Sequence, residues 1–151
     1  MPEEIQVGAL GLRFLHSKHD TAGGLDMFEM TCPTEGRMPA PHYHRDWEET
    51  IYGLSGTLTW TVVGEAVDVG PGDTLFIRRG VVHGFSNRGA VPARCLCVLT
   101  PGVLGPEYFR EMAAALASGP PSLEVLQVAM LKLVRRILLE APGLCLDDRA
   151  Q

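Results

Sequence analysis

The sequence lacks the features that mark membrane, secreted and nucleic-acid-binding proteins. It has no apolar run of about 18 residues, so we expect no membrane span. Its start, MPEEIQVGALG, is acidic and has no charged segment followed by an apolar one, so we expect a cytoplasmic protein. The net charge is −5 and no basic stripe is present, which argues against nucleic-acid binding.

Paired cysteine motifs are also missing. The chain has four cysteines, at positions 32, 95, 97 and 145, and none forms the CxxC spacing that a zinc ribbon requires. Cys95 and Cys97 are two residues apart, so they share one face of a strand and are expected to be buried thiols. Without a secretion signal, we expect these thiols to be reduced.

What the sequence does contain is a series of short β-type segments in its first hundred residues. Val, Thr, Ile and aromatic residues are frequent in them, and glycine-containing turns separate them. No helical pattern interrupts the series, so it predicts an all-β barrel or sandwich rather than a parallel α/β sheet. The predicted strands are residues 10–15, 25–32, 49–54, 57–63, 73–77, 83–86 and 93–99.

After TPG at residues 100–102 the pattern becomes helical. Pro106 can open a helix that continues through residues 107–118, and residues 122–140 have the 3–4 apolar spacing of a second helix. The length of 151 residues fits one domain. We therefore predict a barrel over residues 1–105, with residues 106–151 forming helices that pack on the barrel or on a second subunit.

Several potential metal ligands gather in PHYHRDWEET, residues 41–50. His42 and His44 are two apart, so in an extended segment they point to the same side. Glu48 and Glu49 point in opposite directions, so only one of them joins the histidines. A tight turn at Ser55-Gly56 predicts a hairpin.

In that hairpin Ile51 pairs with Trp60 and Glu49 pairs with Val62, so Glu49 points inward. His83, in RRGVVHGFSN, adds a third imidazole, with Phe85 on the same face. Three imidazoles and one carboxylate suit a first-row divalent metal and leave positions open for substrate, as a catalytic site requires. The alternative for His42, His44 and the glutamates is an exposed polar turn.

Regularly spaced glycines and histidines surround these residues in two stretches. GRMPAPHYHRDWEETIYGLSG carries Gly36, His42, His44, Glu49 and Gly56, and GDTLFIRRGVVHGFSN carries Gly72, Gly80, His83 and Asn87. The two stretches resemble the paired motifs of the cupin superfamily. The sequence departs from that pattern at Arg78, where the motif usually has proline, and this departure bears on loop geometry rather than on metal binding.

The resemblance implies a six- to eight-stranded antiparallel jelly-roll barrel with a metal ion inside. It implies that His42, His44, Glu49 and His83 bind one divalent ion, either Fe, Mn, Ni, Cu or Zn. The helical tail after TPG resembles single-domain, quercetinase-like cupins. Residues expected to line a pocket for a small-molecule ligand are Met38, Ile51, Trp60, Val62 and Phe85, for which plain core packing is the alternative.

Three functions remain open at this point. The first is a dioxygenase-type oxidoreductase, in which Glu49 is a ligand or leaves the ion to act as a base. The second is an isomerase or lyase whose metal is a Lewis acid. The third is a non-enzymatic binding or sensing protein. We also expect a homodimer, because the open sheet edges of the barrel need covering.

Overall fold

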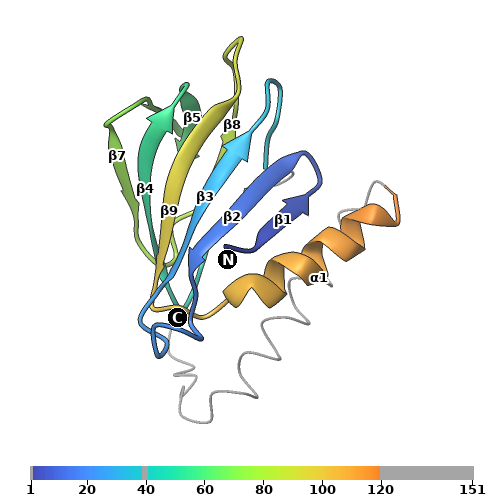
Figure 1. Cartoon of the computed structure of the whole chain (residues 1–151). Coiled ribbons are helices and arrows are strands. Elements are labelled where there is room, and N and C mark those ends of the chain that lie inside the picture. The colour runs from blue at the N-terminus through green and yellow to red at the C-terminus, as the bar shows by residue number, and fades with distance from the viewer. Residues whose placement is uncertain (1, 39–40, 120–151) are drawn as a thin grey trace.

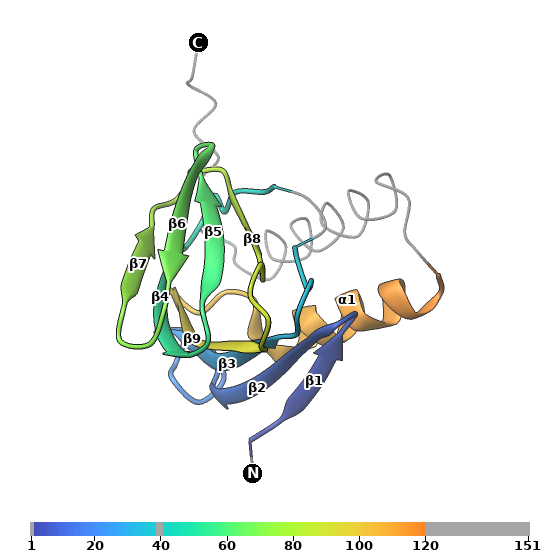
Figure 2. The same cartoon turned by 90° about the horizontal axis from the view of Figure 1, so that it is seen from above.

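The computed structural model of the protein describes residues 2–38 and 41–119, which form nine strands and one helix. A six-stranded antiparallel sheet, in the order β1-β2-β3-β9-β4-β7, faces a three-stranded sheet, β6-β5-β8 (Figure 1, Figure 2). This arrangement confirms the predicted all-β cupin-type fold with a C-terminal helix. The elements are β1 (Glu4–Val7), β2 (Leu10–His16), β3 (Asp26–Cys32), β4 (Glu48–Ser55), β5 (Leu58–Val62), β6 (Glu65–Val69), β7 (Thr74–Ile77), β8 (His83–Ser86), β9 (Ala93–Thr100) and α1 (Gly105–Ala117).

All seven predicted strands are present, and β1 and β6 are additional. The predicted hairpin between β4 and β5 is wrong. β4 pairs with β7 and β9 in the large sheet, whereas β5 pairs with β6 and β8 in the small one. The chain passes between the sheets at Gly56, whose φ is +66° and where an added Cβ would lie 2.6 Å from the Pro92 carbonyl oxygen. A side chain at position 56 would collide with this carbonyl, so only glycine allows the chain to pass between the sheets here.

Buried side chains of the large sheet form the main core on its inner face. Alternate residues of β3 and β9 are buried, as the period of two in a strand requires. Cys95 and Cys97 are among them, with their sulfur atoms 3.8 Å apart, so the expectation of buried thiols on one face is confirmed. Within the described residues Cys32, Cys95 and Cys97 are all free.

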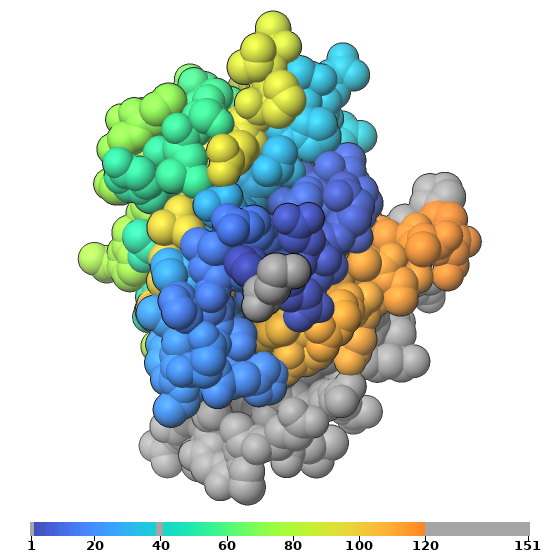
Figure 3. Space-filling view, in the orientation of Figure 1, coloured from blue at the N-terminus to red at the C-terminus, as the bar shows by residue number. Residues whose placement is uncertain are grey.

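The helix α1 covers the part of the inner face that the small sheet does not reach. Its Phe109 packs against Phe14 of β2 and Phe28 of β3, with ring centroids 5.5 and 5.2 Å apart. Pro106 in its first turn and an alanine-rich sequence favour the helix. Figure 2 shows α1 running alongside β1 and β2, and Figure 3 shows its surface adjoining that of β1 and β2.

A fully buried carboxylate fastens the start of α1 to the sheet. Asp26, the first residue of β3, accepts hydrogen bonds from the backbone N–H groups of Lys18, Leu104 and Gly105 at 2.7, 3.1 and 3.0 Å. The three donors come from the β2–β3 connection and from the N-terminal end of the helix. Asp26 therefore satisfies backbone groups that the helix cannot pair internally.

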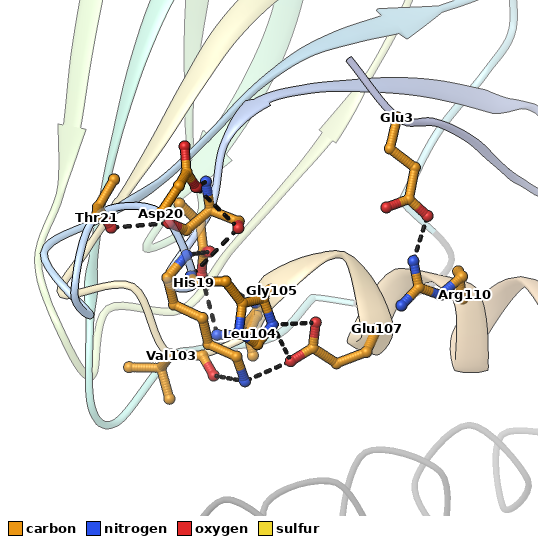
Figure 4. Close-up of polar contacts among 12 residues, drawn as sticks. Glu3, His19, Asp20, Thr21, Val103, Leu104, Gly105, Glu107 and Arg110 are labelled. Atoms are coloured by element: carbon orange, nitrogen blue, oxygen red, sulfur yellow. Dashed lines mark hydrogen bonds and ion pairs between the residues drawn. The ribbon is translucent and has the colours of Figure 1, made fainter. Parts of the chain in front are cut away.

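A second, more exposed cluster supports the same contact (Figure 4). The Lys18 ammonium lies 2.6 Å from a carboxylate oxygen of Glu107, and His19 Nε2 lies 3.1 Å from both of its oxygens. Arg110, one turn further along α1, pairs with Glu3. These ion pairs connect the helix to the β2–β3 loop and to the N-terminal segment.

Glu107→Gln is expected to lower the free energy of unfolding at neutral pH by about 1 kcal/mol, because the pair is partly exposed to solvent. Burial raises the pKa of Glu107, but hydrogen bonds from Lys18, its own backbone N–H and His19 lower it from 4.5 to about 2. The stabilisation is therefore fully present above pH 4.5 and is lost as the pH falls to about 2. Urea unfolding at pH 7 and pH 3 measures this. A difference between variant and wild type that is as large at pH 3 as at pH 7, or one equalled by Glu65→Gln on the exposed part of β6, would contradict the assignment.

The predicted helix over residues 122–140 and Cys145 lie outside the described residues. Within residues 2–38 and 41–119, no helix is long and apolar enough to cross a membrane.

Candidate metal centre

The two motif stretches lie next to each other because the segment after β3 runs antiparallel to β8. His42 and His83 exchange two backbone hydrogen bonds, of 2.9 and 2.8 Å. Further along, the Met38 N–H donates to the Phe85 carbonyl at 2.9 Å, and the Asn87 N–H donates to the Gly36 carbonyl at 2.8 Å. The segment thus adds an irregular edge to the small sheet and places His42 directly opposite His83.

The three predicted histidines meet inside the molecule. The ring centroids of His42 and His83 are 4.5 Å apart, and that of His44 is 4.9 Å from each of the other two. One nitrogen from each ring lies within 4.8 Å of the others, which is the spacing of three ligands to one ion. Oε2 of Glu49 lies 3.4 Å from His44 Nε2 and 3.5 Å from His83 Nε2. The structure therefore brings all four predicted ligands together.

One hydrogen bond fixes the orientation of the His83 ring. Its Nδ1 lies 2.8 Å from the Val81 carbonyl oxygen. Because a carbonyl only accepts, Nδ1 carries a proton, and the ring in its neutral form presents the Nε2 lone pair to the cluster. His83 Nε2 is buried and makes no hydrogen bond within the described part of the chain. A buried, unpaired nitrogen lone pair beside two imidazoles and a carboxylate fits a divalent metal ion.

The charges of Glu49 and His83 are coupled. Burial raises the pKa of Glu49, but its interactions with His44 and His83, whose Nε2 atoms lie 3.4 and 3.5 Å from Oε2, outweigh this and lower the pKa to about 2. Burial lowers the pKa of His83, yet Glu49 and the Val81 carbonyl outweigh this and raise it. Glu49 is thus an anion at neutral pH, and a bound cation would be balanced by its charge.

The neighbouring glutamate is on the opposite side of the strand. Glu48 receives hydrogen bonds from the guanidinium of Arg79, at 2.6 Å from Nε and 3.1 Å from Nη2. The sequence analysis selected Glu49 by assuming that β4 and β5 pair in a hairpin, but these two strands belong to different sheets. Glu49 nevertheless faces inward, because it pairs with Ile77 and Leu99, which are both buried.

These adjacent glutamates provide a matched test of the centre. Glu49→Gln is expected to weaken Zn²⁺ binding at least about 10-fold, the lower end of what loss of even an outer-shell partner costs. Glu48→Gln removes the same charge from the outer surface and is expected to leave Zn²⁺ affinity unchanged. Isothermal titration calorimetry of both variants measures the difference. Equal affinities would show that Glu49 takes no part in binding the ion.

The sequence analysis did not identify Trp47 as a site residue. The Trp47 ring stacks on His44, with centroids 4.5 Å apart and planes 28° apart. The available signal was its position two residues before Glu49, which puts both side chains on the inner side. Trp47 therefore supports the ring of one candidate metal ligand by stacking.

The five predicted pocket residues all lie in or against the core. Ile51, Trp60 and Phe85 are buried, and Met38 and Val62 are half-buried. The centroid of Trp60 is 4.9 Å from that of Phe85 and 6.3 Å from that of His83, and Val62 pairs with His83 across the small sheet. Tyr43, between His42 and His44 in the sequence, is exposed. The predicted pocket residues thus lie in the core that adjoins the centre, and their contact with a ligand stays a prediction.

Comparison with known proteins gives consistent matches. The sequence model of the cupin domain family matches residues 28–99. The chain is 34% identical over 106 residues to the tetracenomycin polyketide synthase protein TcmJ of Streptomyces glaucescens, covering 68% of this chain and 69% of TcmJ. It is 28% identical over 100 residues to quercetin 2,3-dioxygenase of Bacillus subtilis, covering 66% of this chain but only 29% of that enzyme. The solved structure of the polyketide cyclase RemF from Streptomyces resistomycificus matches with 31% identity and a TM-score of 0.56, over 66% of this chain and 72% of RemF.

Proposed function

The chain belongs to the cupin family, and from that premise we propose that it is a metal-dependent enzyme acting on a small, oxygen-rich organic substrate of the polyketide type. The observation that carries the proposal is the convergence of His42, His44, His83 and the ionised Glu49 on one point of the interior. Imidazole and carboxylate ligands suit Fe, Mn, Ni, Cu or Zn, and four of them leave coordination positions for substrate.

The relatives support this substrate class. TcmJ and RemF are both more than 30% identical to this chain, and the names of both refer to polyketides. Polyketides carry carbonyl and hydroxyl oxygens at regular intervals, which are suitable ligands for a divalent cation. The buried aromatic residues beside the centre provide an apolar surface for the carbon skeleton.

We propose cyclisation of such a substrate as the reaction. A bound ion supplies Lewis-acid chemistry, by polarising a carbonyl oxygen. The Val81 carbonyl holds the His83 ring in one orientation, and Trp47 holds the His44 ring by stacking. Glu49 has a pKa of about 2, which makes it a weak base, so we assign it to charge balance and ligation rather than to proton abstraction.

A dioxygenase is the second candidate. It is supported by the match to quercetin 2,3-dioxygenase, which is more distant at 28% identity. The same set of donors suits a redox-active ion. Non-enzymatic binding of a small molecule is the third possibility. In that case the four side chains bind the ion, and the organic molecule is bound but not converted.

The decisive experiment combines metal analysis with product analysis. The protein is loaded in turn with Zn²⁺, Fe²⁺, Ni²⁺ and Cu²⁺ and incubated with a poly-β-keto thioester or with quercetin, in air and under nitrogen. Cyclised product formed equally under nitrogen supports the proposal. Oxygen consumption with a redox-active ion supports the dioxygenase. Binding of both compounds without turnover by any metal form would overturn both enzymatic assignments.

We also propose that the chain forms a homodimer. Phe76 on β7 and Tyr52 and Leu54 on β4 are exposed on the outer face of the large sheet, where two adjacent strands present apolar side chains. Apolar groups gathered in this way favour association. A mass of one chain in sedimentation equilibrium would contradict this proposal.

A further inference from the structure

Both tryptophans of the chain lie beside the metal centre. The sequence contains only two, and they come from different segments: Trp47 precedes β4, and Trp60 is in the middle of β5. Trp47 stacks on His44 at 4.5 Å, and the Trp60 ring lies 6.3 Å from His83. The two indoles thus approach different imidazoles of the same cluster.

Both indole N–H groups are buried without an acceptor. Trp47 is 7% exposed and Trp60 is 1% exposed. Within residues 2–38 and 41–119, neither Nε1 atom has a hydrogen-bond partner. Buried indole N–H groups usually have a partner, and a buried donor without one destabilises the fold. Phenylalanine would fill much of this space without an unpaired donor, so the two N–H groups need an acceptor that the described residues do not supply.

The chemistry of these side chains limits what that acceptor is. An indole N–H only donates, so its partner is an oxygen or nitrogen lone pair. Trp60 also packs on Phe85 at 4.9 Å, and Met38 packs against the same core. A planar ring system that carries carbonyl or hydroxyl oxygens offers both an apolar face to these rings and lone pairs to the N–H groups.

We propose that the N–H groups of Trp47 and Trp60 donate hydrogen bonds to oxygen atoms of a planar, oxygenated organic ligand held beside the metal centre. The proposal rests on the proposed function and names the ligand class and two residues that select for it. A ligand of the same shape without oxygens would leave both donors unpaired, so the tryptophans discriminate against plain hydrocarbons.

The experiment uses the full chain saturated with Zn²⁺, with quercetin and 2-hydroxy-1,4-naphthoquinone as oxygenated probes and naphthalene as the probe without oxygen. The ¹H–¹⁵N spectrum contains two indole signals, which Trp47→Phe and Trp60→Phe assign. We expect an oxygenated probe to shift both signals downfield and to slow their hydrogen exchange. Each variant is expected to bind that probe about 3- to 10-fold more weakly, with little change for naphthalene. Tyr43→Phe, at an exposed position, is the control and is expected to bind the probes as wild type does.

Several results would overturn the proposal. Indole signals that respond to Zn²⁺ but not to a bound probe would assign the N–H groups to enclosed water. Equal probe affinities in wild type and both variants, or no binding of either oxygenated probe to the Zn²⁺-loaded protein, would also refute it. Calorimetry measures the Zn²⁺ affinity separately. A protein that binds no Zn²⁺ would contradict the proposed metal centre, whereas a Zn²⁺-loaded protein that binds no oxygenated probe would contradict this proposal.

Discussion

His83→Ala is expected to weaken Zn²⁺ binding more than about 100-fold, since loss of even an outer-shell partner costs about 10- to 100-fold. His83 is 1% exposed, its ring is fixed by the Val81 carbonyl, and its Nε2 is unpaired beside Glu49. The variant removes the most enclosed of the three imidazoles, and the two that remain, with Glu49, are nearer the surface. Calorimetric titration with Zn²⁺ gives the affinity directly.

The change in stability on adding metal provides an independent readout. At a free Zn²⁺ concentration about 100 times its dissociation constant, the wild-type protein is expected to gain about 2.7 kcal/mol in its free energy of unfolding. His83→Ala is expected to lose this gain while remaining folded without metal, which circular dichroism establishes. His16→Ala changes an exposed histidine outside the cluster and is the control. A full gain in His83→Ala would exclude His83 as a ligand.

Asp26→Ala is expected to lower the free energy of unfolding by about 3–5 kcal/mol, because each buried polar group left without a partner costs about 1–3 kcal/mol. The Asp26 side chain is fully buried and accepts three backbone hydrogen bonds. Without it, the N–H groups of Lys18, Leu104 and Gly105 have no acceptor at this position. Urea unfolding measures the loss.

A second carboxylate, which also accepts a backbone hydrogen bond but is exposed to solvent, provides the control for Asp26→Ala. Asp73, in an exposed turn, accepts a hydrogen bond from the Gly70 N–H at 3.0 Å. Asp73→Ala is expected to cost only about 0.5–1.5 kcal/mol, because water can replace the lost acceptor. Similar losses in the two variants would show that the burial of Asp26 adds nothing. We also expect Asp26→Ala to loosen α1, which faster amide exchange in Phe109 and its neighbours would report.

The strands and the candidate metal ligands were predictable because their signals are local. Period-two alternation marks β3 and β9, and the spacing of His42, His44 and His83 between fixed glycines matches a known family pattern. β1 carries the same alternation, but four residues are too few to stand out. β6 was missed because most of its residues are exposed, so no buried face appears in EAVDV.

What the sequence does not reveal depends on distant contacts. Ser55-Gly56 resembles a hairpin turn, yet the chain changes sheets there because Gly56 packs against Pro92 and Ala93, nearly 40 residues away. Glu49 was identified correctly only because both the assumed and the actual register put it on the buried side of β4. The burial of Trp47 likewise depends on the His44 ring that covers it.

The mutual backbone hydrogen bonds of His42 and His83 have a consequence for biosynthesis. A nascent chain that has not yet reached residue 83 carries only two of the three clustered imidazoles, and the edge that orients them has no strand to pair with. The three-imidazole cluster therefore cannot assemble before residue 83 has been synthesised. A fragment that ends before residue 83 is expected to lack both the third imidazole and the strand that aligns His42.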